Sequence, residues 1–126
     1  MVLGYGRVGT LVARACLGLG LNVVGVRASI KQEYRGEDGV TVYPVSCLDS
    51  LLPKAEVLMV TLPGTSSTSG MIDKQRLKLL PSGAILVNVG RGSVINEQVA
   101  CFKSNCGKGM VICTDIFVSV QLSVSG

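Results

Sequence analysis

The sequence predicts an α/β fold in which helices cover both faces of a doubly wound, mostly parallel sheet, in three α/β/α layers. Short β-branched runs alternate with helical patterns from end to end of the chain. A glycine-rich stretch stands at the junction of the first strand and the first helix. With 126 residues, of which 48% are hydrophobic and 16% charged, the chain has the length and the core material for one domain.

The first expected strand covers residues 1–4, and a helix follows its glycine turn. Apolar residues at the spacing i, i+3, i+4, i+7, i+8 and i+11 indicate this helix and predict a single buried stripe on it. These residues are Val8, Leu11, Val12, Ala15, Cys16 and Leu19. Gly18 and Gly20 are expected to end the helix, because glycine is a poor helix former.

A second strand is expected at residues 22–27, with the sequence NVVGVR. The polar stretch at 28–39 is interpreted as a surface loop, and a short strand follows it at 40–43. Ser46 is expected to cap a short helix that ends near Leu52.

The strongest strand signal is the run EVLMVT at residues 56–61, and a loop rich in Pro, Gly, Ser and Thr follows at 62–70. Asp73 is expected to cap a helix at 74–80. The rest of the chain continues the alternation of strands and helices. It is expected to hold a strand at 84–88 after the turn Pro81-Ser82-Gly83, a helix near 96–103 and a strand at 110–114.

The motif Gly4-Tyr5-Gly6-Arg7-Val8-Gly9 has the spacing G-x-G-x-x-G between a strand and a helix. In this setting the first glycine allows a tight turn, the second lets a pyrophosphate approach the backbone, and the third lets the helix pack on the strand. Free N–H groups of the first helical turn then face the anion. The motif predicts dinucleotide binding, with a purely structural turn as the alternative. Arg7 is either a phosphate ligand or a solvated side chain.

The end of the second strand indicates which dinucleotide is preferred. A carboxylate at this place would bind the ribose 2′-hydroxyl of NAD. Here the strand ends in Arg27-Ala28-Ser29, followed by Lys31, so a guanidinium and a hydroxyl stand where a carboxylate would repel a 2′-phosphate. The sequence therefore favours NADP(H) over NAD(H). The alternative is a solvated charge at the strand end.

A third motif, Asn88-Val89-Gly90-Arg91-Gly92, directly follows the strand at 84–88. Ligands of open α/β sheets bind outside the carboxyl ends of the strands, so we expect Arg91 to face this crevice. Its guanidinium has the geometry to bind a substrate carboxylate. The alternative is a loop arginine that binds backbone carbonyls.

Three segments have a specific pattern: LLPSGAILVNVGRG at 79–92, supported by Leu62-Pro63 through Thr68 and by Thr114-Asp115-Ile116-Phe117. With these segments, the chain from residue 1 to about 117 resembles the nucleotide-binding domain of the D-isomer-specific 2-hydroxyacid dehydrogenases, which include glyoxylate/hydroxypyruvate reductases and phosphoglycerate dehydrogenase. The resemblance implies a Rossmann dinucleotide-binding domain at 1–117 and a divergent tail at 118–126. It also implies hydride transfer between a nicotinamide cofactor and a small 2-keto or 2-hydroxy acid in the complete enzyme, and dimerisation through this domain.

The resemblance further implies roles for single residues. Arg91 would be catalytic by binding the substrate carboxylate and carbonyl, and Asp115 would hold the nicotinamide carboxamide. Arg27 stands where NAD-preferring relatives carry Asp. The expected cofactor-binding residues follow the carboxyl ends of the strands. They are Gly4, Tyr5, Gly6, Arg7, Val8, Gly9, Arg27, Ala28, Ser29, Leu62, Pro63, Thr68, Val89, Gly90, Arg91 and Asp115.

The sequence departs from the family in its acid–base residues, and we expect residues 1–126 to hold the cofactor domain without the substrate-binding lobe. The family uses a His polarised by a Glu after the Asp-x-Phe segment, whereas this sequence has no His and carries Val120 and Gln121 where Glu and Pro are expected. General acid–base catalysis contributes about 10²–10⁴-fold to rate. We therefore expect the chain to bind nucleotide but to turn over little substrate alone. The alternative is a non-catalytic module that senses NAD(P)H and binds other proteins.

Composition argues against several other classes of protein. Twelve Lys and Arg against eight Asp and Glu give a net charge of +4, but the basic residues are scattered and aromatics make up only 4%, which argues against nucleic-acid binding. The apolar runs are too short for a membrane span. Five cysteines without any His indicate reduced thiols and no zinc site. No signal peptide is recognised, so a cytosolic or organellar location is expected.

Overall fold

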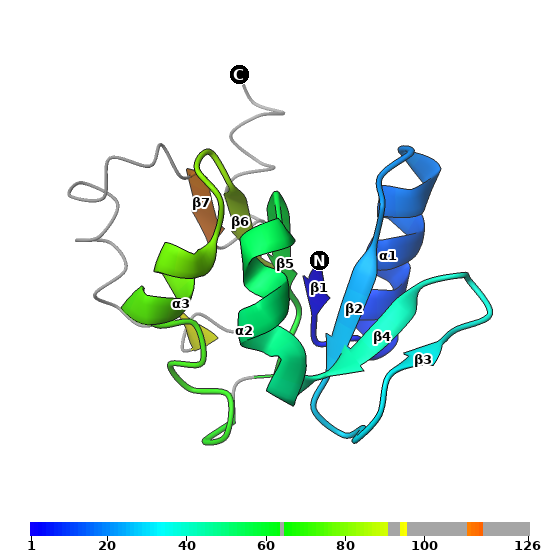
Figure 1. Ribbon diagram of the computed structural model, residues 1–126, viewed down its shortest axis with the longest axis horizontal. Coiled ribbons are helices and arrows are strands. Elements are labelled where there is room, and N and C mark those ends of the chain that lie inside the picture. The colour runs from blue at the N-terminus through cyan, green and yellow to red at the C-terminus, as the bar shows by residue number, and fades with distance from the viewer. Residues whose placement is uncertain (64, 91–93, 96–110, 115–126) are drawn as a thin grey trace.

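The computed structural model describes residues 1–63, 65–90 and 94–95, and the backbone of 111–114. These residues form a seven-stranded sheet in the order β3-β4-β2-β1-β5-β6-β7 (Figure 1). Neighbouring strands are parallel, except that β3 runs antiparallel to β4. The strands are β1 (Val2–Leu3), β2 (Val24–Arg27), β3 (Tyr34–Arg35), β4 (Thr41–Pro44), β5 (Val57–Val60), β6 (Ile85–Asn88) and β7 (Val111–Thr114). The expected doubly wound α/β fold is confirmed.

Helices lie on both faces of the sheet. Val2 of β1 packs in a hydrophobic cluster with helix α1 (Arg7–Gly18), whereas Leu3 packs in a second cluster with α2 (Leu48–Leu51) and α3 (Lys74–Leu79). Successive side chains of a strand point to opposite faces. Helix α1 therefore covers one face, and α2 and α3 cover the other (Figure 1).

Helix α1 ends at its glycines, as expected. Gly20 has a φ of 82°, and its N–H donates to the carbonyl of Leu17 at 2.9 Å, while the N–H of Leu21 donates to the carbonyl of Cys16 at 3.1 Å. These two bonds form a Schellman motif, which needs a left-handed residue and satisfies the last helical carbonyls. At 12 residues α1 is the longest helix described, and no helix in the described part of the chain is long and apolar enough to cross a membrane.

The single buried stripe expected on α1 is wrong in part. Gly9 and Ala13 are buried, but Val8 is 53% and Leu11 60% exposed. The reason is the close approach at Gly9, where a Cβ would lie only 2.3 Å from the carbonyl oxygen of Gly4. This contact turns the smallest residues of the helix toward the sheet. The expected stripe residues that stay exposed are Val8, Leu11, Ala15 and Leu19.

The expected helix at 46–52 is split, and the expected cap at Ser46 is wrong. A 3-10 turn, η1 (Val45–Cys47), precedes α2, and a second, η2 (Leu52–Lys54), follows it. Ser46 lies inside η1, and no side chain caps η1 or α2. Pro44 fixes its own φ at −69° in an extended conformation, so the helical turn begins directly after it and before Ser46.

The stretch expected to be a loop at 28–39 contains strand β3. The N–H of Gly36 donates to the carbonyl of Val40 at 2.9 Å, the N–H of Val40 donates to the Asp38 carboxylate at 3.0 Å, and Gly39 has a φ of 82°. These contacts turn the chain from β3 into β4. The dipeptide Asp38-Gly39, which is typical of hairpin turns, was the available signal.

Candidate functional site

A cleft of about 730 Å³ opens at the carboxyl ends of β1, β2 and β5. Strand β1 lies at the centre of the sheet, with β2 on one side of it and β5 on the other. The chain runs outward from β1 through β2 and β4 and returns to place β5 against the other edge of β1. Open α/β sheets bind their ligands at this kind of topological switch point.

The cleft brings together most of the residues expected to bind a cofactor. Its lining, apart from Thr61, consists of such residues. They are Gly4, Tyr5, Gly6, Arg7, Val8, Arg27, Ala28, Ser29, Leu62, Pro63, Val89 and Gly90. Gly9 is buried beneath the turn, and Thr68 is not part of the lining. Arg91 and Asp115 lie outside the described residues.

The glycine-rich turn is closed against β2 by backbone hydrogen bonds. The N–H groups of Gly4 and Tyr5 both donate to the carbonyl of Val26, at 2.9 and 3.0 Å, and the N–H of Gly6 donates to the carbonyl of Gly4 at 2.8 Å. Gly4 has a φ of 102°, which other residues rarely adopt. The turn therefore directs α1 away from the end of β1 within three residues.

Gly6 and Gly9 serve different purposes in this turn. A Cβ at Gly9 would collide with the carbonyl oxygen of Gly4, so Gly9 is needed for packing. A Cβ at Gly6 would meet no atom within 4 Å. The fold does not require a glycine there, and the missing side chain instead leaves open space in the cleft, as the approach of a pyrophosphate requires.

The N-terminus of α1 carries unused donors. Its N-cap, Gly6, provides no side-chain hydrogen bond, and the first turn contains no acidic residue. The first helical bond runs from the N–H of Thr10 to the carbonyl of Gly6, at 2.9 Å. The N–H groups of Arg7, Val8 and Gly9 have no acceptor among the described residues. Such a helix end is suited to bind an anion.

Thr61 is a lining residue that the sequence reasoning missed. It directly follows β5, and its hydroxyl donates to the carbonyl of Gly4 at 2.6 Å. The hydroxyl thus ties the end of β5 to the glycine-rich turn. The available signal was a polar residue at the end of the buried run EVLMVT.

Tyr5 anchors the segment after β2 to the glycine-rich turn. Its ring lies on Gly25, where a Cβ would come within 2.6 Å of the ring. Its hydroxyl donates to the carboxylate of Asp38. This hydrogen bond, together with the one from the Val40 N–H, lowers the pKa of Asp38, whereas burial and the same hydrogen bond raise the pKa of Tyr5. The bond fixes the hairpin of β3 and β4 beside the cleft.

The segments that follow β5 and β6 are in backbone contact. The N–H of Val89 donates to the carbonyl of Val60 at 2.9 Å, and the N–H of Gly90 donates to the side-chain oxygen of Asn88 at 3.0 Å. A Cβ at Gly90 would lie 2.3 Å from the carbonyl oxygen of Leu62. Gly90 is therefore required for this wall of the cleft to close.

Thr68 stabilises the loop after β5 instead of facing the cleft. It is only 6% exposed, and its hydroxyl donates to the carbonyl of Pro63. The same oxygen accepts a hydrogen bond from the N–H of Thr65 at 2.9 Å. Its expected contact with the cofactor stays a prediction, and its observed contacts are those of a loop-forming residue.

The described lining of the cleft is positive. Arg7 and Arg27 are exposed there, no acidic residue lines it, and neither arginine forms an ion pair with a described residue. Among the described residues no group of His, Cys, Asp and Glu is arranged to hold a metal ion. The arrangement therefore offers backbone N–H groups and guanidinium groups to an elongated anionic ligand.

Comparison with known sequences gives a consistent family assignment. The profile of a family described as D-isomer specific 2-hydroxyacid dehydrogenase, NAD binding domain, matches residues 1–123. A glyoxylate reductase of Thermococcus onnurineus is 35% identical over 97 residues, covering 77% of this chain and 28% of the relative. A D-3-phosphoglycerate dehydrogenase of Archaeoglobus fulgidus is 31% identical over 116 residues, covering 92% of this chain and 21% of the relative. The chain thus spans well under half the length of these relatives.

Solved structures of similar fold carry both kinds of nicotinamide dinucleotide. A D-isomer specific 2-hydroxyacid dehydrogenase from Xanthobacter autotrophicus Py2, in complex with NADPH and MES, matches 89% of this chain and 47% of that chain with a TM-score of 0.75 and 29% identity. A D-lactate dehydrogenase from Aquifex aeolicus, complexed with NAD and lactic acid, matches 98% of this chain and 37% of that chain with a TM-score of 0.72 and 26% identity.

Proposed function

Because the chain belongs to the D-isomer specific 2-hydroxyacid dehydrogenase family, as its NAD binding domain, we propose that its cleft binds a nicotinamide dinucleotide and prefers NADP(H) to NAD(H). The observation that carries the proposal is the uncapped N-terminus of α1, which lies beside the open space over Gly6. A negative charge is stabilised at such a helix end by about 0.3–1 kcal/mol from the dipole, in addition to its hydrogen bonds.

The residues present fit this cofactor. The free N–H groups at the start of α1, with Arg7, would hold the pyrophosphate. Arg27 and Ser29, at the end of β2, would hold the 2′-phosphate. Leu62, Pro63 and Val89 would exclude water from the part of the cleft beyond the pyrophosphate.

In the complete enzyme the substrate would be a small 2-keto or 2-hydroxy acid. The bound nicotinamide supplies or accepts a hydride in this chemistry. Arg91, next in sequence to Gly90, would bind the substrate carboxylate and stabilise negative charge on the substrate oxygen, and Asp115 would hold the carboxamide. Two relatives are named as a glyoxylate reductase and a D-3-phosphoglycerate dehydrogenase, which supports a small acid substrate.

We propose that this chain alone binds dinucleotide but turns over little. The sequence contains no His that could act as the acid–base residue of the family. The proposal also places the end of the cofactor-binding domain near residue 117. It further includes dimerisation through this domain and an intracellular location. Reduction of glyoxylate or hydroxypyruvate by the purified chain at a rate that depends on Arg91 would contradict the expected inactivity.

The proposal is tested by calorimetric titration of the purified chain with NADPH and NADH. We expect binding of both, with higher affinity for NADPH, and a preference for NADH in Arg27→Asp. In Gly6→Asp the new carboxylate would accept hydrogen bonds from the free N–H groups at the start of α1 and so cap the helix. We therefore expect the affinity for both cofactors to fall by about a hundredfold while the helix stays folded. A folded wild-type chain that binds neither cofactor would overturn the proposed function.

A further inference from the structure

A second pocket, of about 490 Å³, adjoins the cleft. It shares part of its lining with the cleft, namely Tyr5, Gly6, Arg7 and Arg27. The residues that line only the second pocket are Thr10, Leu11, Arg14 and Tyr34. None of these four was expected to bind the cofactor. The pocket lies between α1, the end of β2 and β3.

Three arginines line this pocket. Arg7 and Arg14 are seven residues apart on α1 and therefore lie on the same side of the helix, two turns from each other. Arg27 joins them from the end of β2. None of the three forms an ion pair with a described residue, and no acidic residue lines the pocket. Positive charges gathered in one concave site favour the binding of an anion.

One acidic residue that interacts with the lining of this pocket, Asp38, already has hydrogen-bond partners. Asp38 accepts hydrogen bonds from the Tyr5 hydroxyl and from the Val40 N–H. Arg14 adds to these hydrogen bonds in lowering the pKa of Asp38, so the two charges act on each other. One carboxylate offsets part of the charge of three guanidinium groups, and the pocket stays positive.

The position of the pocket indicates which anion it takes. In doubly wound dinucleotide-binding sheets, the ribose next to the adenine binds at the carboxyl end of the strand that follows the first helix. In this chain that strand is β2. Arg27 offers one planar fork of donors and Ser29 one hydroxyl, whereas a phosphate monoester presents three strongly accepting oxygens. The hydroxyl of Thr10 is committed to the carbonyl of Gly6 at 2.6 Å, so the additional donors of the pocket are Arg14 and the hydroxyl of Tyr34.

We propose that Arg14 and Tyr34 join Arg27 and Ser29 in the subsite for the 2′-phosphate of NADP(H). This inference rests on the proposed function and adds α1 and β3 to the residues that determine cofactor preference. Arg14 would then be a specificity residue that acts only on the phosphorylated cofactor. NADH, which has no 2′-phosphate, would leave it unused.

The test measures binding of NADPH, NADH, 2′,5′-ADP and 5′-AMP to the full chain and to Arg14→Ala. Charged hydrogen bonds of this kind account for about tenfold or more in affinity. We expect Arg14→Ala to weaken NADPH and 2′,5′-ADP by at least that factor and to leave NADH and 5′-AMP within about twofold. Arg14→Lys, which keeps the charge but not the fork, should lose less, and Tyr34→Phe should lose about threefold on the phosphorylated probes only.

Lys54→Ala is the matched control, because it removes one exposed cation at the opposite end of the sheet, near the start of β5. It should leave all four affinities unchanged, and circular dichroism should show the same helix content in every variant. Equal losses for NADPH and NADH in Arg14→Ala, or no loss for either, would overturn the subsite while leaving the proposed function intact. Inorganic phosphate that binds without competing with 2′,5′-ADP would show an independent anion site and would also overturn it. A wild-type chain that binds no dinucleotide would fail the proposed function itself.

Discussion

The N-termini of α1 and α3 lie on opposite faces of the same sheet and are built in opposite ways. In α3 the carboxylate of Asp73 accepts a hydrogen bond from the N–H of Arg76 at 2.9 Å, so the helix start is capped by the chain itself. In α1 the cap is Gly6, which offers no side chain to the N–H groups of the first turn. The capped end needs no ligand, whereas the uncapped end offers its donors to one.

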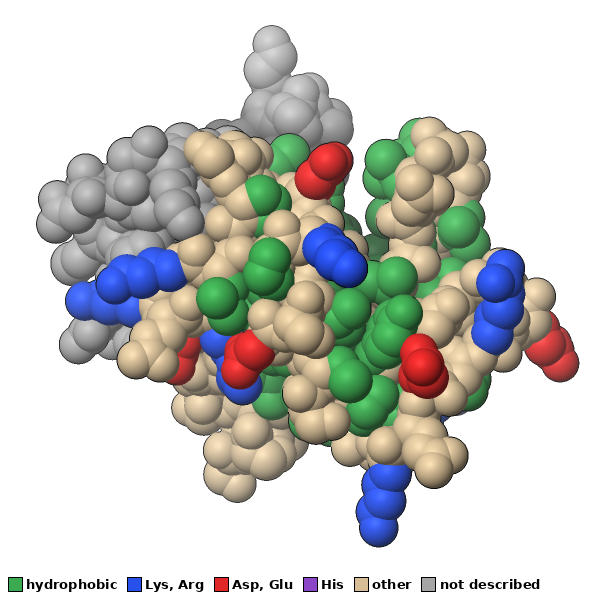
Figure 2. Space-filling view, in the orientation of Figure 1, with side chains coloured by type: hydrophobic (Ala, Val, Ile, Leu, Met, Phe, Trp, Pro, Cys, Tyr) green, Lys and Arg blue, Asp and Glu red, His purple; other side chains and the backbone are tan. Residues whose placement is uncertain are grey.

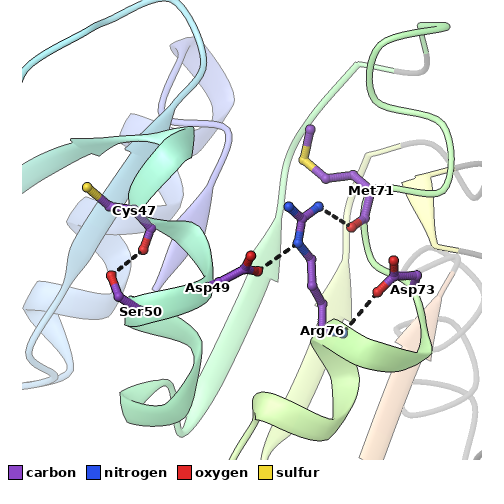
Figure 3. Close-up of polar contacts among 6 residues, drawn as sticks. All are labelled: Cys47, Asp49, Ser50, Met71, Asp73 and Arg76. Atoms are coloured by element: carbon purple, nitrogen blue, oxygen red, sulfur yellow. Dashed lines mark hydrogen bonds and ion pairs between the residues drawn. The ribbon is translucent and has the colours of Figure 1, made fainter.

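The arginines of the two regions differ in the same way. Arg76 donates to Asp49 of α2 at 2.9 Å and to the carbonyl of Met71 at 2.8 Å (Figure 3). On the face that carries α2 and α3, basic and acidic side chains are interspersed (Figure 2). Arg7 and Arg27 have no such partners among the described residues. Arg76 is thus held by partners within the fold, whereas Arg7 and Arg27 remain available to the anionic ligand proposed for the cleft.

Among substitutions at these helix ends, we expect the largest loss of stability at Gly9. In Gly9→Ala the new Cβ would lie 2.3 Å from the carbonyl oxygen of Gly4, which is backbone and has little freedom to move. We expect a loss of about 3 kcal/mol in the free energy of unfolding, measured by urea denaturation, together with loss of dinucleotide binding.

Gly6→Ala is the control for this change, because its Cβ would meet nothing within 4 Å. It should leave the free energy of unfolding within about 0.5 kcal/mol of wild type and weaken only dinucleotide binding. If Gly6→Ala destabilised the chain as much as Gly9→Ala, the division between a packing glycine and a binding glycine would be wrong.

An intermediate effect, which sharpens the comparison, is expected at the capped helix. Asp73→Ala removes the acceptor for the Arg76 N–H, and loss of such a cap costs about 1 kcal/mol. Asp49→Ala removes an exposed partner of Arg76 and should cost about 0.5 kcal/mol or less. Dinucleotide affinity, measured by calorimetry, should not change in either variant. A clear loss of affinity in Asp73→Ala would show that the two helix ends are not independent.

The smallest effect is expected at Asp38 and depends on pH. The hydrogen bond from Tyr5 lowers the pKa of Asp38 in the folded state. The charged carboxylate therefore stabilises the fold at pH values above the ordinary Asp pKa of about 3.9, and this contribution is lost as the pH falls through the lowered pKa. Asp38→Asn should lower the melting temperature by about 2 °C at pH 6 and by less at pH 3. A difference that grows toward pH 3 would have the wrong sign.

The sheet and the glycine-rich site were predictable because their signals are local. The alternation of strands and helices predicts a mostly parallel, doubly wound sheet, and the motif at Gly4, Gly6 and Gly9 specifies its own turn. The three glycines looked equivalent in the sequence, however. Only the distances to Gly4 and the empty space over Gly6 separate packing from binding.

The parts that sequence reasoning missed depend on contacts between distant residues. Thr61 lines the cleft because β5 is the neighbour of β1, which places its hydroxyl on Gly4. Arg14 lines the second pocket together with Tyr34 of β3, on a helix that packs on the sheet through Gly9 and Ala13. The prediction that Val8 and Leu11 are buried was wrong, because periodicity alone does not say which of two adjacent stripes of a helix contacts the sheet.

The packing of the Tyr5 ring on Gly25 also restricts which substitutions are tolerated at these two positions. A Cβ at position 25 would come within 2.6 Å of the ring, so the two positions cannot drift independently. A side chain at 25 would require the Tyr5 ring to move or to be replaced by a smaller residue, and either change would remove the anchor of the neighbouring hairpin. Among relatives, an aromatic residue at 5 should therefore coincide with glycine at 25.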